Sequence, residues 1–254
     1  MPWALLLEYD GTPFFGWQRQ ADGLTVQAVL EAAAARLTGG APVASVVAGR
    51  TDTGVHAAGQ VAMLDLPDGF QAGKVRDALN FHLRPHPVAV LQAAPALPGW
   101  NPRFSATGRA YAFRILNRRA PPALDLYRAW HVERPLDAGA MAEAAALLVG
   151  HHDFSSFRAA ACQARSPMRT LDRLHVSRQG EVVEIVAEAR SFLHHQVRNM
   201  AGTLKLVGEG RWRADQVGAA LAARDRRAAG PTAPPAGLTL LRVRYPQDPF
   251  AALP

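Results

Sequence analysis

The chain has 254 residues, of which 49% are hydrophobic, so it can bury a substantial core as one large domain or two smaller ones. Its 28 Lys and Arg residues, most of them Arg, outnumber the 21 Asp and Glu residues, and the resulting net charge of +7 favours a polyanionic partner. The single cysteine, Cys162, excludes an internal disulfide and a thiolate zinc site.

An apolar run from Trp3 to Tyr9 opens the chain and is typical of a buried strand. It is too short for a signal peptide or a membrane span, so we expect a cytoplasmic protein without a membrane partner. Thr25 is expected to cap a helix that runs to Thr38, because apolar residues recur there at helical spacing. The other elements predicted in this half are strands at 43–47, 60–66 and 88–97 and a helix at 71–83.

The order of these elements is the split βαβ, or ferredoxin-like, pattern. Prolines between Pro95 and Pro102 mark a linker, and a similar order follows it. The elements predicted there are strands at 109–116, 170–177, 181–189 and 238–245, helices at 138–149 (capped by Asp137), 192–206 and 214–223, and a loop at 225–237. The sequence therefore predicts an α+β protein with two ferredoxin-like (βαββαβ) halves, residues 1–105 and 106–254, whose sheets lie side by side around a basic central cleft.

The segment VVAGRTDTGVHAAGQVA, residues 46–62, breaks an apolar pattern with charged side chains between glycines. Most carboxylates in such loops are solvated or cap a turn, and Asp52 by itself indicates no chemistry. Gly49 and Gly54, however, let the backbone approach a ligand closely, and Arg50 could pair with Asp52 or reach a phosphate. Asp52 is therefore a candidate catalytic residue.

Two adjacent histidine pairs, at 151–152 and 194–195, suggest a metal site. Neighbouring residues on a helix point about 100° apart and chelate one ion poorly, and no His-x-x-x-His pattern accompanies them. We therefore predict packing and hydrogen bonding for these side chains and no metal. Ser155 and Ser156 lack the Gly-x-Ser-x-Gly elbow, which argues against a nucleophilic triad. No glycine-rich phosphate loop occurs, which argues against nucleotide-driven chemistry.

Two more side chains are ambiguous. Tyr111 alternates with Phe113 and Ile115 along a predicted strand, and this periodicity alone assigns it to the core. Arg198 lies in an apolar helical segment, where a buried guanidinium needs a partner. A carboxylate such as Asp52 would serve, but the pattern does not place the two together.

Five segments together point to one family: EYDGTPFFGWQRQ (8–20), AGRTDTGVHAAGQVA (48–62), RAYAFRILN (109–117), SFLHHQVRNMAGTL (191–204) and GLTLLRVRYP (237–246). In order and spacing they resemble the tRNA pseudouridine synthase A family from about residue 3 to residue 246. The second and fourth segments are long and specific. The family fold, two ferredoxin-like halves, agrees with the predicted element order. One departure is visible, since Thr53 follows the Asp where many members have Ala.

The resemblance implies an enzyme that isomerises uridine to pseudouridine at positions 38, 39 and 40 of the tRNA anticodon stem-loop. It makes Asp52 the nucleophile, Tyr111 the side chain that stacks on the target base, and Arg198 the partner of the nucleophile. The substrate-binding residues that it implies, to which we add His195, are Arg50, Tyr111 and Leu238. The implied enzyme is a homodimer that uses no cofactor and no metal.

Pseudouridine formation is redox-neutral, and a carboxylate nucleophile could attack either C6 of the base or C1′ of the ribose. Both routes stay open. Two other functions are also compatible with the pattern: an RNA-binding module without activity on the same fold, and a metal-dependent hydrolase built on the histidine pairs. The joint presence of Asp52, Tyr111 and Arg198 favours the synthase.

Overall fold

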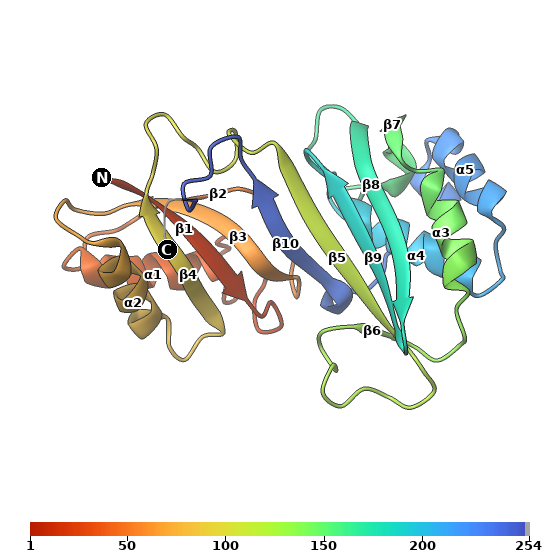
Figure 1. The fold of residues 1–254 in the computed structure, drawn as a ribbon, viewed down its shortest axis with the longest axis horizontal. Helices are drawn as coiled ribbons and strands as arrows, with labels where there is room; N and C mark the ends of the chain where they lie inside the picture. Colours follow the sequence, from red (N-terminus) through yellow and green to blue (C-terminus); the bar gives the residue numbers. More distant parts are fainter. Residues whose placement is uncertain (252–254) are drawn as a thin grey trace. The chain divides into compact units, whose positions relative to one another are not determined.

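The computed structural model describes residues 1–251 and is an α+β protein, as predicted. The chain forms two compact units (Figure 1). Unit 1 contains Met1–Thr107 together with the described residues from Thr239 onward, and unit 2 contains Gly108–Leu238. Within residues 1–251, no helix combines the length and the apolar character needed to cross a lipid bilayer.

Unit 1 is built on a sheet with β1 (Pro2–Tyr9) between two antiparallel neighbours, β3 (His56–Asp65) and β4 (Val88–Pro95). The short strand β2 (Ser45–Val47) pairs antiparallel with the second half of β3, and β10 (Leu238–Arg244) pairs in parallel with its beginning. The helices α1 (Val26–Leu37) and α2 (Ala72–Leu83) pack against each other. The loop that joins β2 to β3 therefore lies at the end of the sheet where β3 starts.

Strand β1 is buried on both faces, which explains its unbroken apolar run. Trp3, Leu5 and Leu7 are at most 2% exposed. Ala4, which alternates with them, belongs to a second cluster that also contains Val61, Ala94, Trp100 and Phe250. Since each fully buried Leu contributes about 1.5–3 kcal/mol to the free energy of unfolding, β1 is a rigid base for the loops at its end.

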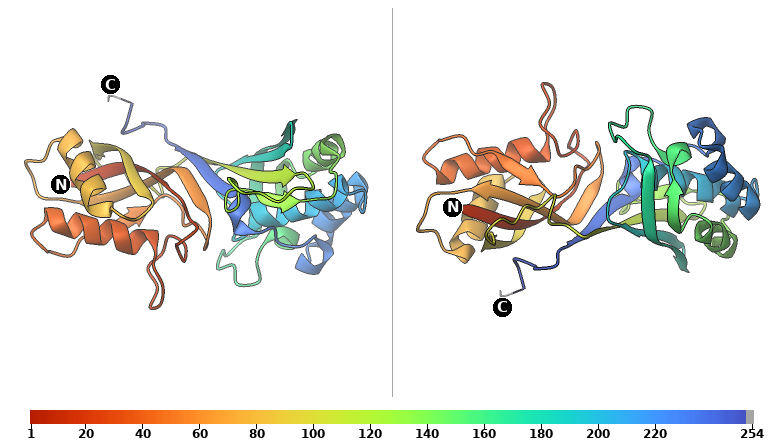
Figure 2. Two further views of the ribbon diagram at one scale, coloured as in Figure 1. Left: turned by 90° about the horizontal axis from the view of Figure 1, so that it is seen from below. Right: turned by 90° about the horizontal axis from the view of Figure 1, so that it is seen from above.

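The main strands of unit 2 are antiparallel neighbours in the order β5 (Gly108–Asn117), β9 (Val182–Ala189), β8 (Met168–Gln179), β7 (Gly150–Asp153). A three-residue strand, β6 (Trp130–Val132), pairs in parallel with the end of β5. The helices α3 (Ala138–Ala146), α4 (Gln196–Gly208) and α5 (Ala214–Ala223) contact one another and gather on one side of these strands (Figures 1 and 2). Short 3₁₀ turns occupy 155–157, 226–228 and 235–237.

The helix caps predicted from the sequence are confirmed. The Thr25 side chain accepts a hydrogen bond from the backbone N–H of Ala28 at 3.3 Å, and Asp137 accepts one from Ala140 at 2.9 Å. Helix α5 begins and ends at the predicted residues, and the β8–β9 hairpin turns at Gly180. These features depend on local sequence, which is why the pattern identifies them.

Removal of the Asp137 cap gives a simple test of the α3 assignment. Asp137→Ala should lower the free energy of unfolding by about 1 kcal/mol, because the Ala140 N–H at the helix start loses its acceptor. Asp137→Asn should retain most of that stability, since Asn also caps well. Urea unfolding monitored by circular dichroism measures both variants. Equal losses for Asn and Ala would contradict the capping role.

Several boundaries differ from the prediction. Strand β3 begins at His56 rather than at residue 60, and α3 ends at Ala146 rather than at 149. Helix α4 begins at Gln196 rather than at 192, because His195 has a left-handed backbone (φ 62°) that a right-handed helix cannot include. Strands β6 and β7 were not predicted, since three or four residues are too few to show a periodic pattern.

Candidate functional site

Asp52 lies partly buried in the loop between β2 and β3, and this loop rests on buried polar groups. Tyr9 Oη and Thr51 Oγ1 are 2.8 Å apart. The Gln60 amide donates to Tyr9 Oη at 3.2 Å and to the Gly49 carbonyl at 2.8 Å. Since the Gln60 side chain is fully buried, water does not compete for these bonds, and they fix the backbone just before Asp52.

A segment that we call the strap, residues 11–17, holds the same loop from another direction. The Gly54 N–H donates to the Phe14 carbonyl at 3.2 Å, and the Trp17 N–H donates to the Thr51 carbonyl at 3.0 Å. Phe14 and Trp17 are each only 1% exposed, so the strap is anchored in the core. The strap therefore bonds the loop on both sides of the candidate carboxylate.

Gly16 allows the strap to lie against the backbone of the loop. It has φ 83°, a left-handed conformation that favours glycine. A Cβ at this position would lie 2.7 Å from the Thr51 carbonyl oxygen and 3.1 Å from the Asp52 carbonyl carbon. Any larger residue would therefore push the loop, and Asp52 with it, away from the strap.

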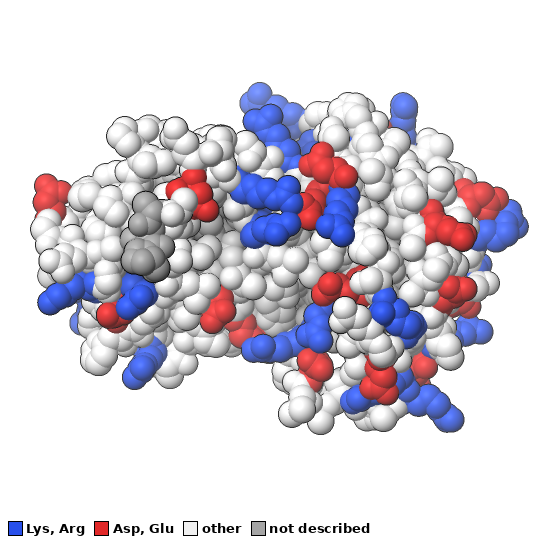
Figure 3. Space-filling model, viewed as in Figure 1, with Lys and Arg blue, Asp and Glu red and all other residues white. Residues whose placement is uncertain are grey.

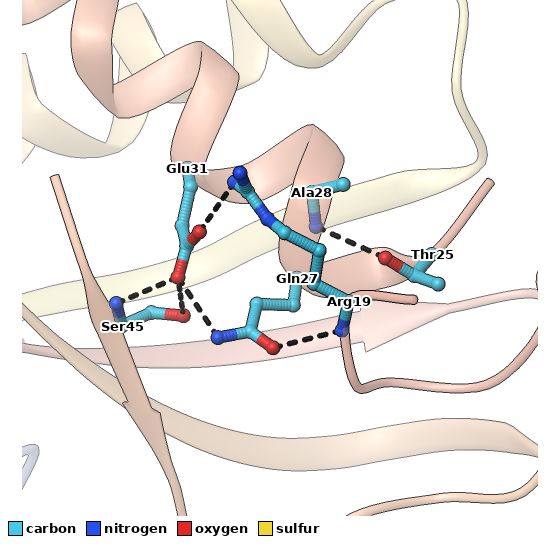
Figure 4. Close-up of polar contacts among 6 residues, drawn as sticks. All are labelled: Arg19, Thr25, Gln27, Ala28, Glu31 and Ser45. Carbon is cyan, nitrogen blue, oxygen red and sulfur yellow. Dashed lines mark hydrogen bonds and ion pairs between the residues drawn. The ribbon is translucent and has the colours of Figure 1, made fainter. Parts of the chain in front are cut away.

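Just beyond the strap, the chain is tied to α1 by a buried carboxylate (Figure 4). Glu31, which is 8% exposed, accepts from the Arg19 guanidinium at 2.6 Å, from the Gln27 amide at 2.9 Å, and from the N–H and hydroxyl of Ser45 at 2.8 and 2.9 Å. The Arg19 N–H in turn donates to Gln27 Oε1 at 3.0 Å. With four donors around it, Glu31 has a structural role that joins α1, β2 and the residue Arg19, which follows the strap.

Tyr111 lies on β5 of unit 2 and is half-buried. Its ring meets the Phe192 ring at right angles, with the centroids 5.3 Å apart, which is a favoured aromatic geometry and fixes the plane of the tyrosine. Phe113 and Ile115, on the same strand, are fully buried. Tyr111 is therefore not part of the closed core to which its periodicity alone assigns it.

Arg198 lies in the first turn of α4 and is hydrogen-bonded to a distant loop. Its Nε–H donates to the Ala233 carbonyl at 2.8 Å, and the Ala233 N–H donates to the Arg198 backbone carbonyl at 3.1 Å. Because the Nε edge is occupied in this way, the guanidinium would bind a carboxylate or phosphate through its two terminal nitrogens.

His194 and His195 precede α4 instead of lying on it. Their ring centroids are 4.0 Å apart, with an angle of 41° between the planes. The left-handed backbone of His195 turns the pair away from helical geometry. The argument that adjacent helical residues diverge by about 100° therefore does not apply to this pair, and the two imidazoles form one cluster before the helix.

The predicted site residues divide between the two units. Arg50 and Asp52 belong to unit 1, whereas Tyr111, His195, Arg198 and Leu238 belong to unit 2. Arg50 is exposed, and Leu238 is 6% exposed at the start of β10. Sequence reasoning missed the strap and the polar groups beneath the Asp52 loop. A signal for the latter was Gln60, an amide in an apolar strand, since a buried amide requires partners.

Comparison with known proteins gives consistent matches along almost the whole chain. A family model described as tRNA pseudouridine synthase matches residues 6–105 and 144–246. The tRNA pseudouridine synthase A of Acidiphilium cryptum is 69% identical over 249 residues, which cover 98% of each chain. A protein of the same name from Paramagnetospirillum magneticum is 63% identical, and the match covers 95% of this chain and 94% of that protein. Another, from Gluconobacter oxydans, is 56% identical, and the match covers 98% of this chain and 91% of that protein.

Proposed function

The chain belongs to the tRNA pseudouridine synthase family, and from this membership we propose that it isomerises uridine at positions 38, 39 and 40 of the tRNA anticodon stem-loop. It is an isomerase that modifies tRNA. The catalytic role proposed for Asp52 rests on one observation: hydrogen bonds hold its loop in two ways, to the buried polar groups Tyr9 and Gln60 and to the strap. A fixed carboxylate is what a positioned nucleophile requires.

The proposed reaction breaks the N1–C1′ bond of uridine and forms a C5–C1′ bond after the uracil has turned. The C5 proton leaves to solvent and N1 gains a proton, so the product is an isomer and no oxidant or reductant is consumed. Asp52 acts as the covalent nucleophile, at C6 or at C1′, and is released when the new bond has formed. The proposed reaction uses no cofactor and no metal.

Arg198 is proposed to pair with Asp52 and to keep the carboxylate ionised and oriented while the base is enclosed. Its support is the fixed guanidinium, held through Nε by Ala233. Arg50, His195 and Leu238 are proposed to line the substrate site, as the family resemblance implies. Arg50 is exposed at the start of the Asp52 loop, which suits contact with a phosphate.

Tyr111 is proposed to stack on the uracil, because a π face holds a ring while leaving it able to turn. Tyr111→Phe should therefore keep most of the activity and bind tRNA normally, whereas Tyr111→Ala should lose about 1–3 kcal/mol of stacking and most of its turnover. Pseudouridine formation at saturating tRNA measures the two variants. An equal loss in both would assign the function to the hydroxyl group instead of the ring.

Binding of tRNA is proposed to rest on phosphate contacts. Figure 3 shows Lys and Arg side chains on the surface of both units, interspersed with Asp and Glu. The net charge of +7 supports a polyanionic partner, and phosphate contacts would offset the few kcal/mol needed to flip the target base out of the stack. Such binding recognises the shape of the RNA and weakens as salt is raised.

We also propose a ferredoxin-like fold for the two units and a homodimeric assembly. In unit 1 the chain order β1, α1, β2, β3, α2, β4 supports a ferredoxin-like half, and we propose a variant of it for unit 2. The family resemblance supports a cytoplasmic homodimer. Analytical ultracentrifugation measures the oligomeric state directly, and a species of one chain at micromolar concentration would contradict the dimer.

The specific proposal is tested by mapping the product. Purified protein is incubated with an unmodified tRNA transcript that has uridines at positions 38–40 and elsewhere, and pseudouridine is located by chemical labelling and primer extension. We expect pseudouridine at positions 38–40 alone, and none in a transcript with cytidine at these positions. Pseudouridine in another part of the tRNA would contradict the proposed substrate site while leaving the isomerase activity intact.

A further inference from the structure

The loop between α5 and β10 folds onto the N-terminal half of α4. A Cβ on Gly202 would lie only 1.8 Å from the Pro231 carbonyl oxygen, so the loop backbone lies directly on the helix where that helix has no side chain. Gly202 and Ala233 are both fully buried or nearly so. The backbone of this loop is therefore closely packed against α4, so a small displacement of the loop would also displace the helix.

Three polar side chains, which we call the Arg226 network, close this loop: Asn199, Arg226 and Thr232. The Arg226 guanidinium donates to the Gly230 carbonyl at 2.8 Å, and to Asn199 Oδ1 and Thr232 Oγ1 at 3.1 Å each. The Thr232 hydroxyl donates to Asn199 Oδ1 at 2.6 Å. Asn199 is fully buried and donates through its own amide to the Phe157 carbonyl at 2.8 Å. The network thus ties the loop to the body of unit 2.

The residue that follows Thr232 is the one that orients Arg198. Ala233 contacts Arg198 through both its N–H and its carbonyl, and the carbonyl accepts from Arg198 Nε. The network holds the chain immediately before this carbonyl, and Asn199 is also the helix neighbour of Arg198. Both ends of the contact between Ala233 and Arg198 are therefore fixed by the same three side chains.

We propose that Asn199, Arg226 and Thr232 are positioning residues that set the orientation of the Arg198 guanidinium. This inference rests on the proposed role of Arg198 in the reaction. None of the three needs to touch the RNA. They fix where the Ala233 carbonyl lies, and that carbonyl fixes the plane in which the terminal nitrogens of Arg198 meet an anion.

The competing role for Arg226 is direct binding of an RNA phosphate. Burial lowers the pKa of Arg226, but a guanidinium stays charged at neutral pH. The acceptors that it bonds are uncharged, namely carbonyls, an amide oxygen and a hydroxyl. A phosphate-binding Arg226 would act on tRNA affinity, whereas a positioning Arg226 acts on turnover, so the two roles predict different measurements.

Thr232 offers the sharpest variant, because it is exposed and Val keeps its shape without the hydroxyl. Thr232→Val should lower turnover at saturating tRNA by about tenfold, as expected for a displaced reactive group, and leave the Kd for tRNA unchanged. Thr232→Ser should keep wild-type turnover, since serine retains the hydroxyl group that donates to Asn199. Wild-type turnover in Thr232→Val, or a change in Kd alone, would overturn the proposal.

Arg226 and its neighbour Arg227 form a matched pair. Arg227 is bonded to Asp225 and its side chain is 90% exposed. Arg226→Met should lower turnover without weakening tRNA binding or changing its salt dependence, and Arg227→Met should leave turnover unchanged. A loss of affinity in Arg226→Met with normal turnover would assign Arg226 to phosphate binding and contradict the positioning role.

A double-mutant cycle separates this inference from the proposed function. If the network acts through Arg198, Thr232→Val should have no further effect on turnover when it is added to Arg198→Met. Full additivity of the two changes would contradict it. The proposed function itself would be contradicted by a different result, namely wild-type protein that binds tRNA but forms no pseudouridine.

Discussion

Replacement of Asp52 by Asn is expected to abolish pseudouridine formation while tRNA binding persists. Asn has the size and shape of Asp but cannot form the covalent bond that the proposed reaction requires. Loss of a nucleophile costs on the order of 10⁴-fold or more in turnover. The loop itself should keep its place, because it is held by Thr51 and Gly54 through bonds that do not involve the Asp52 side chain. Nucleoside analysis of the tRNA measures turnover, and fluorescence titration measures affinity.

The control for this variant is Asp68→Asn. Asp68 is in the same unit, and its side chain is 91% exposed beside the chain N-terminus, so its charge can be removed without touching the loop. It should retain wild-type turnover. A variant at Asp52 that still forms pseudouridine, or that loses tRNA affinity and keeps its turnover, would remove Asp52 from the chemistry.

Gly16→Ala is expected to have the second largest effect, although Gly16 carries no reactive group. The new methyl would overlap the Thr51 carbonyl and press on the backbone of Asp52, so the strap or the loop must move. A shift of about 1 Å at a reacting group can lower turnover by about 10²-fold. The expected result is a large loss of turnover, together with a lower melting temperature.

Gly39→Ala is the matched control for this effect. Gly39 also has a positive φ, 68°, but no atom of a neighbouring segment lies within 4 Å of the added Cβ. Both variants carry the backbone strain of about 1–2 kcal/mol that a left-handed Ala brings. Only Gly16→Ala should also lose turnover, as measured at a temperature where both proteins are folded. Equal turnover in the two variants would show that the strap does not position Asp52.

The sequence predicts elements well where the signal is local. Thr25 and Asp137 are followed directly by the helices that they cap, and α5 buries Val217 and Ala220, which are three residues apart as on one face of a helix. The start of α4 is different. Apolar residues at Phe192 and Leu193 continue the helical pattern, yet the Gln196 side chain accepts from the Leu193 N–H and the chain is left-handed at His195. Tertiary contacts decide that turn, and periodicity contains no information about them.

In the candidate site too, the sequence identifies the residues of one local segment and misses those that hold them from distant parts of the chain. Asp52 and Arg50 are visible in one short segment, because charged residues between glycines are unusual inside an apolar pattern. The groups that hold Asp52 are not visible. The strap contacts the loop across about forty residues of sequence, and Arg226 reaches Asn199 across 27. Hydrogen bonds between such distant positions leave no periodic trace, so only the structure reveals which side chains position the reactive ones.

Asp52 is proposed to drive the isomerisation of uridine in tRNA, a reaction that releases the hydrogen at C5. This role can be measured as tritium release from a tRNA transcript labelled at C5 of uridine, with enzyme in excess and chelator present. Wild type and Asp52→Asn are run side by side at equal tRNA occupancy. If Asp52 is the nucleophile, the wild type should release tritium in proportion to the pseudouridine formed, and Asp52→Asn should release none. Release by Asp52→Asn, or tRNA bound by wild type without any release, would exclude this role of Asp52.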